Sequence, residues 1–146
     1  MIKIAAVHPD VIALDRIRLG QPRLNAEWLE LFNTGSLPTN VSQYFVVNGR
    51  GEGFTISLPR RKTLVVGPYQ SLLIFSGHPD HPEDPALCYL ANQEVRLFLR
   101  RKGYFWNPTS EKAFLYASRD VYLENPGGYL DFYRYERRSA RAVMKK

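Results

Sequence analysis

The residues best suited to chemistry are the two histidines and three carboxylates in the eight-residue segment 78–85 (HPDHPEDP). Imidazole and carboxylate groups are ligands that zinc and other divalent ions take in proteins. The alternative is a solvated loop, because alternating prolines extend the chain and no ligand cluster elsewhere in the sequence completes a site. We favour the loop and expect neither a metal nor another cofactor.

The single cysteine, Cys88, is the other candidate for chemistry. A cysteine beside a histidine is the basis of thiol catalysis. However, free cysteine is among the most buried residue types, and Cys88 lies among Leu87, Tyr89 and Leu90. We therefore expect a structural thiol and a protein that is not an enzyme. A chain with one cysteine also fits a reducing compartment.

The glycine-rich stretch 49–53 (GRGEG) has the composition of a phosphate-binding loop. Such a loop needs a helix after it, so that the helix N-terminus faces the anion. The residues that follow, Phe54–Leu58, have the character of a strand. We therefore predict a hairpin turn, in which glycines supply positive φ angles.

Strand-length apolar stretches make up most of the chain, and all ten prolines and nearly all the glycines lie between them. The breaks recur roughly every eight to twelve residues, which is typical of a sandwich or barrel. Within one stretch, Leu29 and Leu31 share a face, whereas Glu27 and Glu30 must reach water or a partner. We predict an all-β fold, an immunoglobulin-like sandwich, with strands at Ile2–Val7, Glu27–Asn33, Gln43–Val47, Phe54–Leu58, Thr63–Val66, Ser71–Ser76, Val95–Leu99, Lys112–Tyr116 and Leu130–Tyr135.

One segment favours a helix. Asp84 is a suitable N-cap, Pro85 suits the first helical position, and apolar residues follow at helical spacing. The pattern can be continued to Phe98, but residues 95–99 (VRLFL) also alternate and favour a strand. We predict at most one short helix, near residues 85–92, followed by a strand.

Several stretches, taken in order, share the pattern of one family. Residues 26–35 (AEWLELFNTG) join a glutamate-apolar-glutamate strand to an asparagine-x-glycine turn, and residues 37–44 (LPTNVSQY) follow. Further along are 104–107 (YFWN) and 128–135 (GYLDFYRY). The order resembles the lamin tail domain family across residues 1–136. Asn40, Gln43 and Tyr44 replace that family's usual aspartate, glycine and tryptophan.

The resemblance implies an immunoglobulin-like sandwich that serves as a non-catalytic accessory. In nuclear lamins the domain contacts DNA or protein, and in bacteria it is often attached to secreted enzymes or surface proteins. No enzyme accompanies it in these 146 residues, and no signal peptide or membrane-spanning run is recognisable. We therefore expect a stand-alone, cytoplasmic member whose partner is another chain.

The positive charge is concentrated at the end of the chain. The net charge is +6, and residues 137–146 contain five basic residues and no acid, which leaves fifteen bases and fourteen acids before them. We predict a folded domain at 1–136 and a basic, flexible tail at 137–146. The basic residues of the tail are Arg137, Arg138, Arg141, Lys145 and Lys146.

Aromatic and basic residues supply the candidate contacts with a partner. We expect Trp106 and Phe32 inside the sandwich. Some of Tyr129, Tyr133 and Tyr135 are candidates for an outer face beside Arg134, because alternate residues of a strand point the same way and tyrosine and arginine are enriched at binding hot spots. The alternative, which we favour for any single one of them, is packing in the core, where large aromatic residues usually lie in sandwiches. A possible basic patch, or simply a solvated surface, is formed by Arg60, Arg61, Lys62, Arg100, Arg101 and Lys102.

Together these features predict a non-catalytic interaction module, an adaptor or assembly subunit, that binds another protein chain or a larger assembly. The alternative is a nucleic-acid-binding protein whose tail and basic turns grip the backbone without reading sequence. Membrane insertion and small-molecule substrates are not expected.

Overall fold

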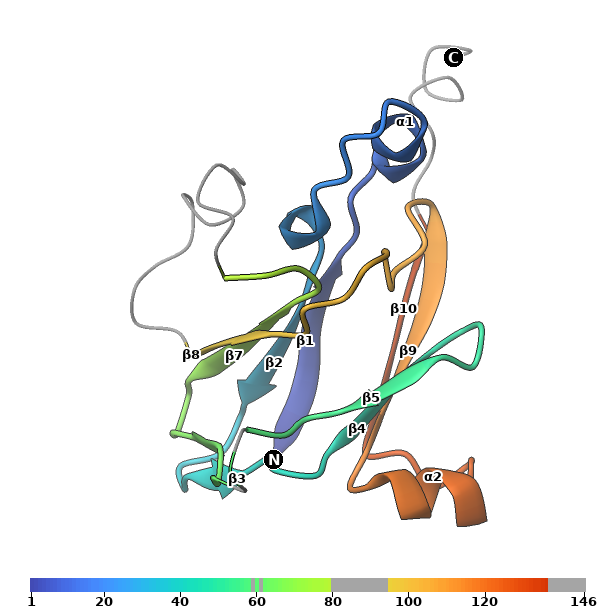
Figure 1. Cartoon of the computed structure of the whole chain (residues 1–146). Coiled ribbons are helices and arrows are strands. Elements are labelled where there is room, and N and C mark those ends of the chain that lie inside the picture. The colour runs from blue at the N-terminus through green and yellow to red at the C-terminus, as the bar shows by residue number, and fades with distance from the viewer. Residues whose placement is uncertain (59, 61, 80–94, 137–146) are drawn as a thin grey trace, which may run out of the picture.

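Two four-stranded β-sheets pack face to face in the computed structural model of the chain, which describes residues 1–58, 60, 62–79 and 95–136 (Figure 1). The elements in chain order are β1 (Ile2–His8), α1 (Ala13–Arg18), η1 (Leu24–Ala26), β2 (Trp28–Asn33), β3 (Thr39–Asn40), β4 (Phe45–Asn48), β5 (Gly53–Thr55), β6 (Val65–Val66), β7 (Ser71–Phe75), β8 (Val95–Phe98), β9 (Ser110–Tyr116), α2 (Arg119–Glu124) and β10 (Asp131–Glu136). The sheet orders are β1-β2-β7-β8 and β10-β9-β4-β5, and β3 pairs with β6. This is the all-β sandwich predicted from the sequence.

The sandwich is joined along one side, where β1 lies beside β10. The backbone N–H of Ile4 donates a 2.7 Å hydrogen bond to Oδ2 of Asp131 across this junction. On the other side, within the described residues, β5 pairs only with β4, and β8 pairs only with β7, in parallel. Strands β5 and β8 are therefore the outermost strands of the two sheets.

The core lies between the sheets and follows strand alternation. Leu29 and Leu31 of β2 share one face, as predicted, and both are fully buried; Trp106 is 2% exposed and lies inside, as expected. Phe32 is only half-buried, contrary to expectation. It lies on the opposite face of β2 from Leu31, because successive side chains of a strand alternate.

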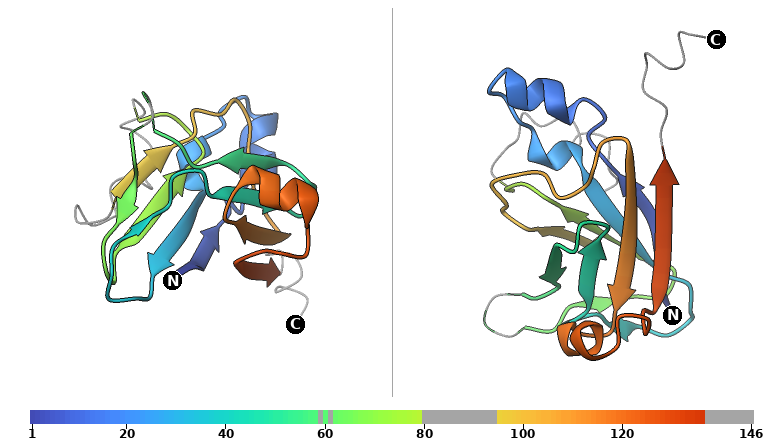
Figure 2. Two further views of the ribbon diagram at one scale, coloured as in Figure 1. Left: turned by 90° about the horizontal axis from the view of Figure 1, so that it is seen from below. Right: turned by 90° about the vertical axis from the view of Figure 1, so that its right-hand side faces the viewer.

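The prediction of at most one short helix is wrong. Both α1 and α2 are six residues long, too short for an apolar period to show in the sequence. Ser118 caps α2, its hydroxyl accepting a 3.2 Å hydrogen bond from Val121 N–H. The two helices lie at opposite ends of the molecule (Figure 2). The helix predicted near 85–92 lies outside the described residues.

Each predicted strand has a counterpart, with ends displaced by up to three residues. The preference for a strand at 95 is confirmed by β8. The hairpin prediction for 49–53 is confirmed as well, since β4 and β5 pair in antiparallel fashion and Gly51 has a φ of 82°. The two-residue strand β3 was not predicted.

Candidate binding site

A buried carboxylate fixes the segment that leads into β9. The side chain of Glu27 accepts hydrogen bonds from Ser76 Oγ (2.6 Å), Phe105 N–H (2.6 Å) and Trp106 N–H (3.1 Å). Glu27 was expected to reach water or a partner, and these three groups are its partners. Burial raises the pKa of Glu27 to about 7, and these hydrogen bonds oppose that rise. Because Glu27 is fully buried, its role is to hold this segment in place.

The second glutamate that needed a partner also has one. Glu30 is half-buried, and its Oε2 accepts a 2.7 Å hydrogen bond from Ser71 Oγ on β7. The glutamates around Leu29 and Leu31 are therefore both bound within the domain.

The two tyrosines of strand β10 point toward the core, and its exposed face carries other residues. Tyr133 and Tyr135 are half-buried and pack against the core, and the hydroxyl of Tyr135 donates to the carbonyl of Asn107. Of the two alternatives, core packing therefore holds for Tyr133 and Tyr135, and they are not the outer tyrosines of a binding face, because alternation turns Phe132 and Arg134 outward instead. Tyr129, just before the strand, is 44% exposed.

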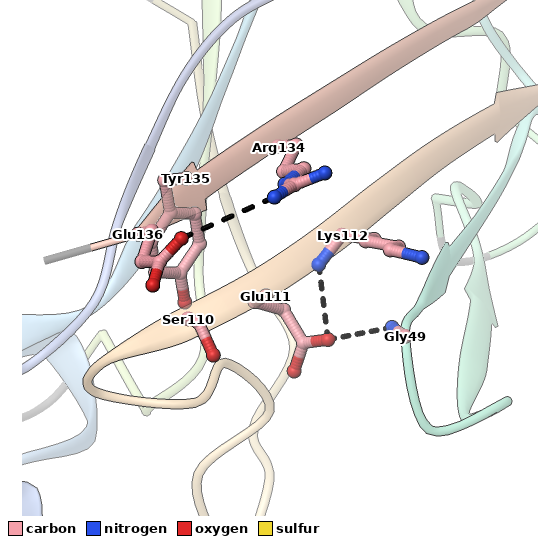
Figure 3. Close-up of a pocket in the computed structure, with 7 residues that line it drawn as sticks. All are labelled: Gly49, Ser110, Glu111, Lys112, Arg134, Tyr135 and Glu136. Carbon is pink, nitrogen blue, oxygen red and sulfur yellow. Dashed lines mark hydrogen bonds and ion pairs between the residues drawn. The ribbon is translucent and has the colours of Figure 1, made fainter.

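Two cations meet on this outer face. Arg134 of β10 lies directly opposite Lys112 of β9 in the antiparallel register, and both are exposed. They line a depression of about 420 Å³, which we call the β9–β10 depression (Figure 3). Its lining residues are Gly49, Ser110, Glu111, Lys112, Arg134, Tyr135 and Glu136.

The two cations are weakly compensated. Glu136 Oε2 lies 4.0 Å from an Arg134 guanidinium nitrogen, and both side chains are mostly exposed. Such a pair is worth little. The Lys112 ammonium has no ion-pair partner within the part of the chain that the structure describes. Like charges directly opposite each other on a sheet are destabilising, so this arrangement favours an anion.

The floor of the depression is held by Glu111, whose residue is 7% exposed. Its Oε1 accepts hydrogen bonds from Gly49 N–H (2.7 Å) and Lys112 N–H (3.1 Å). Arg50 Nε lies 3.9 Å from Oε2, and the Arg50 guanidinium also donates to the carbonyl of Phe105 at 2.6 Å. Glu111 therefore ties the β4–β5 hairpin to β9 and is committed to structure.

Aromatic rings continue the same face beside the cations. Phe114, which is half-buried, lies 5.0 Å from Phe132 and 5.5 Å from Tyr129 between ring centroids. Phe132 is 39% exposed. Where α2 packs on the sheet, Phe45 and Tyr122 are 5.4 Å apart. The outer face of β9 and β10 thus offers a cationic end and a partly exposed aromatic end.

The other predicted basic residues differ among themselves. Arg60, Lys62, Arg100 and Lys102 are exposed. Arg101 is half-buried; its guanidinium stacks over Phe105 at 5.0 Å and pairs with Glu52 at 3.4 Å. Arg101 is therefore partly structural rather than a member of a simple solvated patch.

Several predicted residues lie outside the described part of the chain. These are Arg61, Cys88, most of the 78–85 segment and the whole basic tail, including Arg137, Arg138, Arg141, Lys145 and Lys146. His78 is described, and its Nε2 lies 3.0 Å from an Arg100 guanidinium nitrogen. Among the described residues, no three histidine, cysteine or acidic side chains gather as a metal site would require.

No protein-family model matches this chain, and no curated protein matches it. Among the described helices, none is long and apolar enough to cross a membrane.

The sequence prediction identified Arg134 and Tyr129 but missed Lys112, Phe114 and Phe132. Strand alternation gave a signal for Phe132, since it shares a face with Arg134. No local pattern indicates Lys112, because its position opposite Arg134 depends on the register of two strands that are separated by a helix.

Proposed function

We propose that this chain is a non-catalytic binding module of the lamin tail domain type, an adaptor or assembly subunit that holds an acidic segment of another protein in the β9–β10 depression. The observation that carries the proposal is the exposed, directly opposed pair of Lys112 and Arg134. A carboxylate bound between them would relieve their repulsion and form charge-assisted hydrogen bonds.

The neighbouring rings favour a protein partner. Phe132 and Tyr129 are partly exposed and adjoin the cations through Phe114. A face with both cations and aromatic rings suits a peptide with acidic and apolar side chains, since aromatic residues and arginine dominate protein-binding hot spots. The depression is shallow and polar, whereas small-molecule sites are mostly apolar clefts.

The basic tail would add affinity for the same partner. Glu136 ends β10 and lines the depression, and the five bases of residues 137–146 follow it in the sequence. Charges connected to the rim of a site raise the rate at which an acidic partner associates.

The same cations favour a second candidate, binding of single-stranded nucleic acid. Lys112 and Arg134 beside exposed rings resemble the combination of backbone-tracking charge and stacking platform used for single strands. This function predicts steep weakening of binding as salt rises, because phosphate contacts release counterions.

Fluorescence anisotropy separates the two candidates. The probes are a labelled glutamate-rich peptide with interspersed tyrosines and a labelled single-stranded DNA of ten nucleotides, titrated with the full chain. We expect the peptide to bind, and the double variant Lys112→Glu/Arg134→Glu to weaken it at least tenfold. The control variant Lys3→Glu/Arg119→Glu has the same net charge as Lys112→Glu/Arg134→Glu. It should bind the peptide nearly as tightly as the unmodified chain does.

An equal loss in the control would show that only net charge matters and would contradict a site in the depression. Tighter binding of the DNA, with a steep salt dependence, would replace the protein-binding proposal by the second candidate.

A further inference from the structure

A second surface lies on the side of the sandwich away from the β1–β10 junction, between β5 and β8. Two hollows of about 270 and 480 Å³ share Ser57, Leu97 and Phe98, and we call the two together the β5–β8 groove. Strand β5 ends one sheet and β8 ends the other. The groove therefore lies where the sandwich is open, and it is independent of the β9–β10 depression.

The outer edge of β5 has peptide groups without a hydrogen-bond partner within the described residues. Ile56 N–H donates a 2.7 Å hydrogen bond to the carbonyl of Tyr44, so the peptide groups of Ile56 point toward β4. Peptide groups of successive residues in a strand point to opposite sides. Those of Thr55, and of Ser57 two residues beyond the end of β5, therefore point away from β4, on the side where no described strand lies beside β5. Such an edge is a template for one more strand.

Apolar side chains form the walls of the groove. Phe54, Leu97 and Leu99 pack against the core but remain half-buried. A segment laid over them would bury the surface that they still expose, which is favourable at roughly 25 cal/mol for each Å² of apolar area.

The charge at the groove is positive. Arg96, Arg100 and Arg101 line it, and no Asp or Glu does so among the described lining residues. Arg101 is partly neutralised by Glu52 at 3.4 Å. Arg100 contacts Nε2 of His78, which carries no negative charge. No described carboxylate pairs with Arg100. Within the described part of the chain, Arg100 is therefore an exposed cation that no carboxylate neutralises.

We propose that the β5–β8 groove binds an extended acidic segment of another protein, which adds to β5 as a fifth strand of its sheet. The backbone of the segment pairs with Thr55 and Ser57, its apolar side chains cover Leu97 and Leu99, and an acidic side chain reaches Arg100. Strand addition obtains affinity from main-chain hydrogen bonds and specificity from alternate side chains, which is the division of roles that this groove provides.

The test is an NMR titration of the ¹⁵N-labelled full chain with a capped ten-residue peptide in which valine and glutamate alternate. In the control peptide, lysine replaces every glutamate. We expect the acidic peptide to bind at least tenfold more tightly and to shift the amide signals of Thr55 and Ser57. Equal affinities, shifts confined to other strands, or no binding at millimolar peptide would overturn the proposal.

Two variants test the contacts separately. Ser57→Pro removes the N–H at the edge and should weaken the acidic peptide at least tenfold, whereas Ser57→Ala should not; thermal unfolding verifies that both are folded. Arg100→Glu leaves the N–H groups of the edge in place. It should abolish the preference for the acidic peptide over the lysine peptide. If the chain self-associates without peptide, and Ser57→Pro prevents this, the strand comes from a second copy and the proposal is wrong.

Discussion

The backbone N–H of Phe105 donates a 2.6 Å hydrogen bond to the fully buried carboxylate of Glu27, a residue 78 positions earlier in the chain. Trp106 donates to the same carboxylate. The segment leading into β9 is thereby attached to the start of β2. Since β9 carries Lys112, this attachment helps to position the proposed binding surface.

Replacement of Glu27 by alanine should be strongly destabilising. The N–H groups of Phe105 and Trp106 would remain buried without an acceptor, and leaving such groups unsatisfied costs about 1–3 kcal/mol each. We expect the free energy of unfolding, measured in urea, to fall by about 2–5 kcal/mol. Glu30→Ala is the control and should cost less, because Glu30 is half-buried and Ser71 is the one described donor to its carboxylate. Equal losses in the two variants would argue against the attachment.

The buried Glu27 should also make stability depend on pH. Its pKa rises from 4.5 to about 7 on folding, so between these values the native state binds more protons than the unfolded state. Stability therefore falls as pH rises from 4.5 to 7 and levels off above 7, by up to about 3 kcal/mol from this group. Glu27→Gln cannot ionise, so the difference in unfolding free energy between the two proteins should change over this range. A constant difference would contradict a raised pKa.

Gly77 should tolerate no side chain. A Cβ there would lie 2.4 Å from Oδ1 of Asn25 and 3.1 Å from its backbone nitrogen. Asn25 is fully buried and bridges Gly77 N–H and the carbonyl of His78, so it has little room to move. We expect Gly77→Ala to lower the melting temperature, at a cost of about 1–3 kcal/mol. Gly103→Ala, where a Cβ meets nothing within 4 Å, should be close to neutral.

The opposed cations Lys112 and Arg134 should lower the stability of the domain, although they contribute to binding. Lys112→Glu places opposite charges across from each other on β9 and β10, and such pairs are worth about 0.2–1 kcal/mol. We expect a small gain in unfolding free energy together with weaker binding of the acidic peptide. Lys62→Glu, at an exposed position outside the helices and strands, should change neither quantity. A loss of stability in Lys112→Glu would show that the two cations do not repel each other.

Alternation and turn residues made much of the fold predictable. Leu29 and Leu31 alternate with charged or aromatic neighbours and so predicted β2 and its buried face. The glycines of 49–53 predicted the hairpin, since a positive φ is needed at Gly51. The two α-helices escaped prediction because six residues complete fewer than two helical turns.

The binding face was only partly predictable. The sequence indicates that Tyr133, Arg134 and Tyr135 lie on one strand, but it does not say which of the two alternating sets faces the core. That choice is made by packing: the ring of Tyr135 reaches Asn107, and Tyr133 contacts the core. The opposition of Lys112 and Arg134 depends on how the chain turns through α2, which no local pattern encodes.

The proposed function is tested most directly by a pull-down from native lysate, carried out with and without nuclease treatment. The baits are the full chain, the Lys112→Glu/Arg134→Glu variant, the Lys3→Glu/Arg119→Glu control and a chain ending at Glu136. We expect one defined protein to be retained by the full chain and by the control, and lost from Lys112→Glu/Arg134→Glu. Reduced retention by the truncated chain would assign part of the contact to the tail. Equal retention by all four baits, or a captured species that disappears with nuclease, would contradict the proposal.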